Sequence, residues 1–119
     1  MKRGRPRLAD YLQHMADALE RIERYTIGFD EETFLEDELV QDAVLRNFEI
    51  AGEAAKNVML CDSEFGAKHP ELPLNDVYLM RNHLAHGYFT VNMRLVWRTL
   101  KQDLPLLAKQ LAVLRSNLT

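Results

Sequence analysis

The chain has 119 residues, which is enough for one domain with a single hydrophobic core. Its formal net charge of −3 argues against a protein that coats nucleic acid through electrostatics alone, so any RNA contact has to be local. The single cysteine, Cys61, excludes an internal disulfide and belongs to no metal-ligand cluster. Because no signal peptide and no apolar run of membrane-spanning length are visible, the sequence predicts a cytoplasmic protein without membrane contact.

The chain begins with a predicted basic arm, residues 1–7, ahead of a single helical domain over residues 8–119. The arm matches the core of an AT-hook, which inserts arginines into the minor groove of DNA, in the run Arg3-Gly4-Arg5-Pro6. A disordered basic arm is the other interpretation, and the sequence leaves the role of this segment open.

Helical periodicity dominates the domain, and strand alternation is almost absent. Apolar residues step by three and four from the start of the domain, which predicts a first helix over residues 8–26 that Gly28 closes. Asp30 is placed to cap a short helix that carries Phe34.

A long helix over residues 38–60 follows. It contains a group of small residues that would let another helix approach closely: Ala51, Gly52, Ala54 and Ala55. Glycine and proline are frequent over residues 61–73, which predicts a loop with one helical turn, and the next helix covers residues 74–86.

Asn92 is placed to cap a last helix over residues 93–116, in which Pro105 should cause a kink. The aromatic residues favoured as core or interface anchors are Trp97, Phe48, Phe34 and Tyr78. The predicted fold is therefore all-α, an antiparallel bundle of four main helices plus a short one.

The most informative stretch, residues 81–88, reads Arg-Asn-His-Leu-Ala-His-Gly-Tyr. On a helical wheel at about 100° per residue, with Arg81 at zero, Tyr88 falls about 20° to one side. On the other side lie Asn82, at about 100°, and His86, at about 140°. Asn82 and His86 are i, i+4 neighbours that can touch, and Arg81 is long enough to reach the same patch. The glycine before Tyr88 ends the helix and leaves the phenol accessible.

These residue types suit phosphate chemistry. Arginine presents a planar fork of donors that fits phosphate oxygens, and it keeps its charge. Histidine takes and returns a proton near pH 7. Arg81 and His86 together therefore predict activation of a ribose 2′-hydroxyl and stabilisation of the charge that grows on phosphorus, without a metal ion. An ordinary solvated Arg/His pair is the alternative that the spacing alone leaves open.

Three segments resemble the HepT-like proteins of the HEPN superfamily, and the resemblance extends over residues 8–115. The segments are Gln41 to Lys56 (QDAVLRNFEIAGEAAK), Met80 to Tyr88 (MRNHLAHGY) and Val96 to Pro105 (VWRTLKQDLP).

The resemblance implies an all-helical homodimer whose two motif helices meet near the dimer axis and form a composite site. It also implies the toxin of a type VII-like toxin–antitoxin pair, a metal-independent RNA endonuclease without a cofactor. Carried over to this chain, Arg81 and His86 are the catalytic pair and Asn82 is a supporting polar residue. The implied partner is an MntA-like minimal nucleotidyltransferase, which neutralises the toxin by transferring AMP to Tyr88.

Two other hypotheses come from different functional classes. The domain is either a non-catalytic subunit that binds a nucleotidyltransferase through Arg81 and Tyr88, or a plain helical dimerisation domain. The sequence leaves open the RNA target, the modification of Tyr88, and the assembly beyond a dimer.

Overall fold

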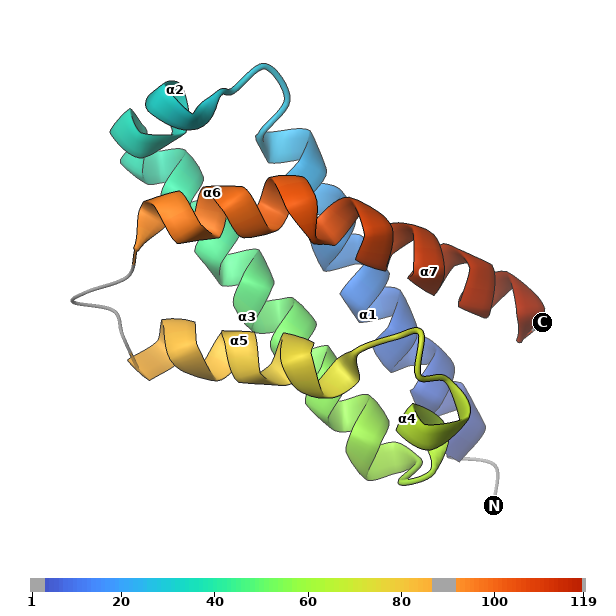
Figure 1. The fold of residues 1–119 in the computed structure, drawn as a ribbon. Helices are drawn as coiled ribbons and strands as arrows, with labels where there is room; N and C mark the ends of the chain where they lie inside the picture. Colours follow the sequence, from blue (N-terminus) through green and yellow to red (C-terminus); the bar gives the residue numbers. More distant parts are fainter. Residues whose placement is uncertain (1–3, 87–91, 119) are drawn as a thin grey trace.

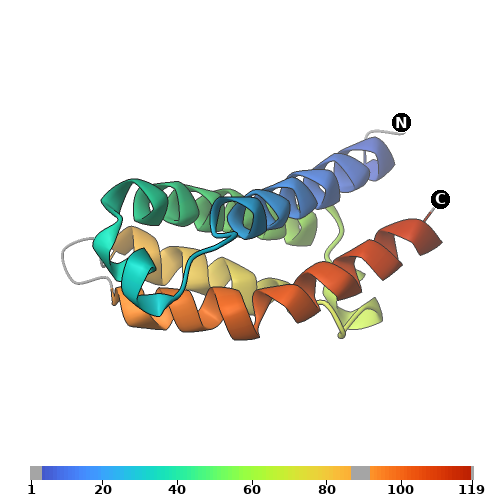
Figure 2. The same cartoon turned by 90° about the horizontal axis from the view of Figure 1, so that it is seen from above.

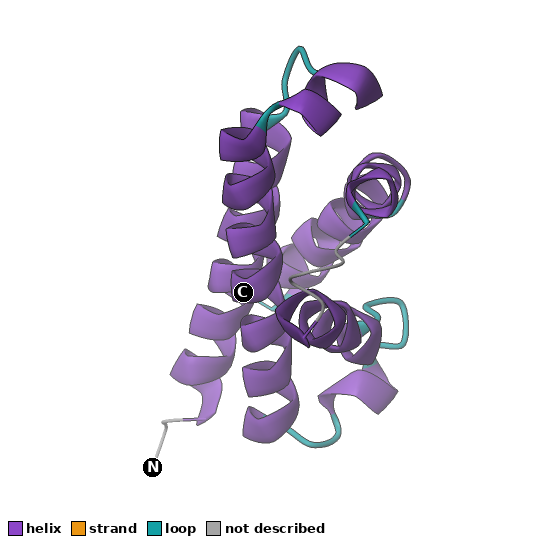
Figure 3. Cartoon of the chain, turned by 90° about the vertical axis from the view of Figure 1, so that its left-hand side faces the viewer, coloured by secondary structure: helices purple, strands orange, loops and turns teal. Residues whose placement is uncertain are grey.

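The computed structural model describes residues 4–86 and 92–118, with side chains described for residues 7–80 and 92–118. Within these ranges all regular structure is helical, and Figure 3 draws the chain there as helices and loops alone. The predicted all-α class is confirmed. Among the described helices, none is both long and apolar enough to cross a membrane.

The described residues form seven helices in two crossing layers. α1 and α3 run antiparallel side by side in one layer, while α5 and the nearly collinear α6 and α7 form the other (Figures 1 and 2). The helices are α1 (Gly4–Tyr25), α2 (Glu31–Glu36), α3 (Glu38–Cys61), α4 (Phe65–Lys68), α5 (Leu74–His86), α6 (Met93–Gln102) and α7 (Leu104–Asn117).

The first helix begins earlier than the sequence predicts. α1 starts at Gly4, so residues 4–7 of the expected arm are part of the helix. Pro6 is compatible with this start, because a proline in the first helical turn removes an N–H that has no partner inside the helix. At its other end the helix stops at Tyr25, and Gly28 adopts a φ of 82° in the following turn, as expected for a closing glycine.

A capping box starts the short helix α2, as predicted from Asp30. The Asp30 carboxylate accepts a hydrogen bond from the backbone N–H of Thr33, and the Thr33 hydroxyl accepts one from the backbone N–H of Asp30. Hydrogen bonds from the Thr33 backbone and side chain lower the pKa of Asp30 from its ordinary value of 3.8, because they favour the charged carboxylate.

The predicted last helix is divided in two at Asp103, and the expected kink at Pro105 accounts for the division. Pro105 lies in the first turn of α7, where its missing N–H costs no helical hydrogen bond within α7. The backbone N–H of Asp103 still bonds to Thr99 O at 2.9 Å, and that of Leu107 bonds to Asp103 O at 3.1 Å. The two helices therefore keep almost one helical register through the break.

The core forms where α3 meets both layers. α3 packs against α1 and against α5, and its small residues Ala51, Gly52, Ala54 and Ala55 are buried, in agreement with the predicted close approach. Of the predicted aromatic anchors, Phe34, Phe48 and Trp97 are buried and Tyr78 is half-buried against the core.

Phe34 is the side chain through which α2 docks on α6. It is completely buried, and its ring centroid lies 5.2 Å from that of Trp97. We expect Phe34→Ala to lower the free energy of unfolding by about 3–5 kcal/mol, because it removes a buried aromatic ring and leaves a cavity. Urea denaturation at one fixed protein concentration measures this loss.

Leu39→Ala is the matched control, since the Leu39 side chain is 79% exposed at the neighbouring start of α3. Its effect should stay within about 0.5 kcal/mol. Equal destabilisation by the two substitutions would contradict the role given to the ring of Phe34.

Candidate active site

The first turns of α5 anchor this helix on the core. Leu74 and Val77 are buried, and Met80 is half-buried against the same cluster. The backbone N–H of Val77 bonds to Pro73 O at 3.1 Å, so the helix is hydrogen-bonded from its first turn. The direction of the rest of α5 is therefore set by its packed first half.

The predicted site residues Arg81, Asn82 and His86 lie in the last six residues of α5, and the predicted helix bounds are confirmed. At 1.5 Å per residue, Arg81 and His86 are about 7.5 Å apart along the helix axis, and Asn82 is one helical turn before His86. The side chains of these three residues, and Tyr88 altogether, lie outside the described residues. Their convergence stays a prediction.

The next helix is fixed close to the motif in the chain, because α6 begins seven residues after His86. The Asn92 side chain caps it and accepts hydrogen bonds from the backbone N–H groups of Arg94, at 3.0 Å, and Leu95, at 3.2 Å. Arg94 also pairs with Glu31 of α2, with 2.6 Å between Nη1 and Oε2. The chain segment that carries Tyr88 therefore connects two helices whose positions are set by packing and capping.

A groove of about 430 Å³ lies between α5 and the α6–α7 pair. Its α5 side ends at Met80, one residue before Arg81. The ionisable groups that line it are the carboxylates of Asp76 and Asp103, which repel phosphate. The groove therefore does not suit an anionic ligand, although it lies beside the motif.

Sequence reasoning missed one buried polar contact between α1 and α3. Asn47 is 4% exposed, and its side-chain amide donates to Ala43 O at 2.9 Å. Arg21 Nη1 donates to Asn47 Oδ1 at 3.2 Å. The available signal was an asparagine at a core position of the long helix, next to Phe48. The pair satisfies buried polar atoms, and it links the two helices of one layer.

Across the described ranges, no group of three or more His, Cys, Asp or Glu side chains is arranged to hold a metal ion.

Comparison with known proteins gives a consistent picture. The model of the family described as "Ribonuclease HepT-like" matches residues 15–114. The chain is 42% identical over 106 residues to a protein of Thermococcus cleftensis named "Probable ribonuclease HepT", covering 89% of this chain and 94% of that protein. It is 38% identical over 110 residues to a protein of Caldanaerobacter subterraneus subsp. tengcongensis named as a "Putative RNase", covering 92% of each.

A third similar protein is longer. It comes from Methanocaldococcus jannaschii, is named a "Gamma-glutamylcyclotransferase and putative RNase", and is 36% identical over 108 residues, covering 91% of this chain and 47% of that protein. No solved structure matches the chain.

Removal of the Asn92 cap should loosen the start of α6. We expect Asn92→Ala to lower the free energy of unfolding by about 0.5–2 kcal/mol, because two backbone N–H groups lose their acceptor. Hydrogen exchange of the Arg94 and Leu95 amides should be faster in this variant. Asn92→Asp keeps an acceptor and should preserve the slow exchange, so faster exchange in both variants would contradict the capping role.

Proposed function

Because the chain belongs to the HepT-like ribonuclease family, we propose that it is an RNA endonuclease that uses Arg81 and His86 and needs no metal ion or cofactor. The observation that carries the proposal is the placement of both residues in the last turns of one helix whose first half is anchored in the core.

The reaction is an attack of a ribose 2′-hydroxyl on the adjacent phosphorus. His86 accepts the 2′-hydroxyl proton as the new O–P bond forms, and the bond from phosphorus to the 5′-oxygen breaks. Arg81 stabilises the extra negative charge on the phosphoryl oxygens. A protonated histidine returns a proton to the departing 5′-oxygen. The products are a 2′,3′-cyclic phosphate and a 5′-hydroxyl, so the reaction balances without water or a cofactor.

The proposed assembly is a homodimer in which the motif helices of two copies meet. A dimer brings two guanidinium groups and two imidazoles to one site, so that one histidine accepts a proton while the other donates one. It also doubles the local positive charge on a chain with a net charge of −3.

The proposed biological role is that of a toxin in a type VII-like toxin–antitoxin pair. The antitoxin is an MntA-like nucleotidyltransferase: the Tyr88 hydroxyl attacks the α-phosphorus of ATP on that enzyme, and pyrophosphate leaves. The resulting AMP group adds a negative charge beside Arg81 in the chain, so it competes with the RNA phosphate.

The nuclease proposal predicts that His86→Ala reduces RNA cleavage by about 10²–10⁴-fold, because the general acid–base is lost. The assay is cleavage of a defined RNA in excess chelator, with detection of 2′,3′-cyclic phosphate ends, and light scattering confirms that the dimer persists. His14→Ala is the matched control, since His14 is exposed on α1, and it should cleave at the wild-type rate.

Wild-type cleavage by the His86→Ala protein would remove His86 from the mechanism. The absence of cleavage by the wild-type chain, together with tight binding to the nucleotidyltransferase, would favour the non-catalytic binding subunit.

The modification proposal predicts a mass increase by whole AMP units when the chain is co-expressed with its cognate nucleotidyltransferase. Tyr88→Phe should abolish the increase, because it removes the acceptor oxygen. Tyr25→Phe, at an exposed tyrosine on α1, should retain it. A mass increase that survives in the Tyr88→Phe protein would assign the modification to another residue.

A further inference from the structure

The charges of the chain are segregated along the sequence. Residues 92–118, which contain α6 and α7, hold five basic residues and one acidic residue, a net charge of +4. The rest of the chain has a net charge of −7, because the whole chain carries −3. A positively charged pair of helices therefore lies on an otherwise acidic molecule.

The five basic residues share one side of α6 and α7. Counted from Arg94 at about 100° per residue, Arg98 and Lys109 fall about 40° and 60° to one side. Lys101 and Arg115 fall about 20° and 60° to the other. This count is valid across the break at residue 103, because backbone hydrogen bonds of helical spacing continue through it. We call these five residues the basic face.

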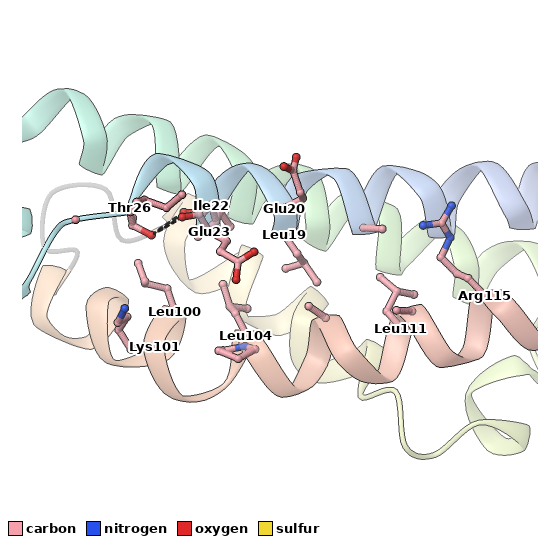
Figure 4. Close-up of a pocket in the computed structure, with 16 residues that line it drawn as sticks. Leu19, Glu20, Ile22, Glu23, Thr26, Leu100, Lys101, Leu104, Leu111 and Arg115 are labelled. Atoms are coloured by element: carbon pink, nitrogen blue, oxygen red, sulfur yellow. Dashed lines mark hydrogen bonds between the residues drawn. The ribbon is translucent and has the colours of Figure 1, made fainter.

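Most of the charge on the basic face is uncompensated. Arg94 pairs with Glu31, but among the described residues no carboxylate lies within ion-pair distance of the other four. Lys101 lies 5.2 Å from the centre of the Trp97 ring, and Arg115 bonds to the uncharged Gln13. Figure 4 shows Lys101 and Arg115 along one side of a groove of about 380 Å³ between α1 and the α6–α7 pair.

Basic residues on the other helices differ in this respect. They form local pairs with carboxylates on the same helix or within one turn of it: Arg24 with Glu20, Arg46 with Glu49, and Lys68 with Glu64. The positive potential is therefore concentrated over α6 and α7.

The residues between the cations are small. Pro105, Ala108 and Ala112 fall within the same arc of the wheel, and all three are exposed. A protein interface has large apolar or aromatic anchors at its centre, and this arc has none among its exposed residues. Small residues between spaced cations instead let a polyanion backbone lie close to the helix. This favours a nucleic-acid strand over an acidic protein.

We propose that the basic face of α6 and α7 binds the phosphate backbone of the RNA substrate. The inference rests on the proposed ribonuclease function and adds the surface that holds the strand. α5 and the α6–α7 pair lie in the same layer (Figure 2), and α6 follows the motif segment directly in the chain. A strand bound along the basic face is held by charge, without reading its sequence, and continues toward the end of α5.

The test is the salt dependence of RNA binding. The probe is a fluorescent 20-nucleotide uridine RNA, and fluorescence anisotropy is measured between 50 and 200 mM salt, in His86→Ala protein so that the RNA stays intact. The first variant carries Arg98→Gln, Lys101→Gln and Lys109→Gln. Each lost phosphate contact on a single strand lowers the slope of log affinity against log salt by about 0.7, so the slope should fall by about 2.

The matched control carries Arg24→Gln, Arg46→Gln and Lys68→Gln, which remove the same total charge at paired positions. Its slope should stay close to that of the parent protein. Circular dichroism verifies that both variants fold, and Arg98→Gln alone, with an expected change of about 0.7, serves if the triple variant does not.

An unchanged slope in the first variant would overturn the proposal, and so would an equal fall in both triple variants. A fluorescent polyglutamate peptide that binds as well as RNA, and loses binding in the first variant, would assign the face to acidic proteins instead. The expected slope change with no cleavage by the wild-type chain would retain the basic face and remove the nuclease. Cleavage with wild-type salt dependence in the first variant would retain the nuclease and remove the face.

Discussion

Burial of the small-residue stretch of α3 is the constraint on which the rest of the structure depends. Ala51, Ala54 and Ala55 leave so little side-chain volume that α3 packs against α1 in its own layer and against α5 in the other. Because close packing in a core tolerates little added volume, this arrangement holds α5 in one position on the molecule. The motif at the end of α5 is thereby carried by a core helix.

The second element that positions the motif is the short helix α2, which is tied to α6 by the Phe34–Trp97 ring contact and the Arg94–Glu31 ion pair. The ring contact is buried and contributes to stability, whereas the ion pair is exposed and contributes little. Both ends of the connection between α5 and α6 are therefore defined by packing. Such a frame suits a connection that carries an acceptor for modification.

Net charge alone gave an incomplete view of this chain. A total of −3 argues against general binding to nucleic acid, yet α6 and α7 carry +4 on one side. The acidic remainder limits nonspecific attraction, and the unpaired cations concentrate attraction where α6 follows the motif. A local basic surface on an acidic protein is consistent with an RNA-acting enzyme that must not coat every RNA it meets.

The sequence by itself determined the helical class, the caps at Asp30 and Asn92, and the bounds of α5, because these depend on periodicity and on hydrogen bonds between near neighbours. Only the tertiary structure decided that α3 packs against two helices and that Asn47 is buried against Arg21. It also decided which cations lack carboxylate partners among the described residues. Those features join residues far apart in the chain, and local pattern does not specify which distant faces meet.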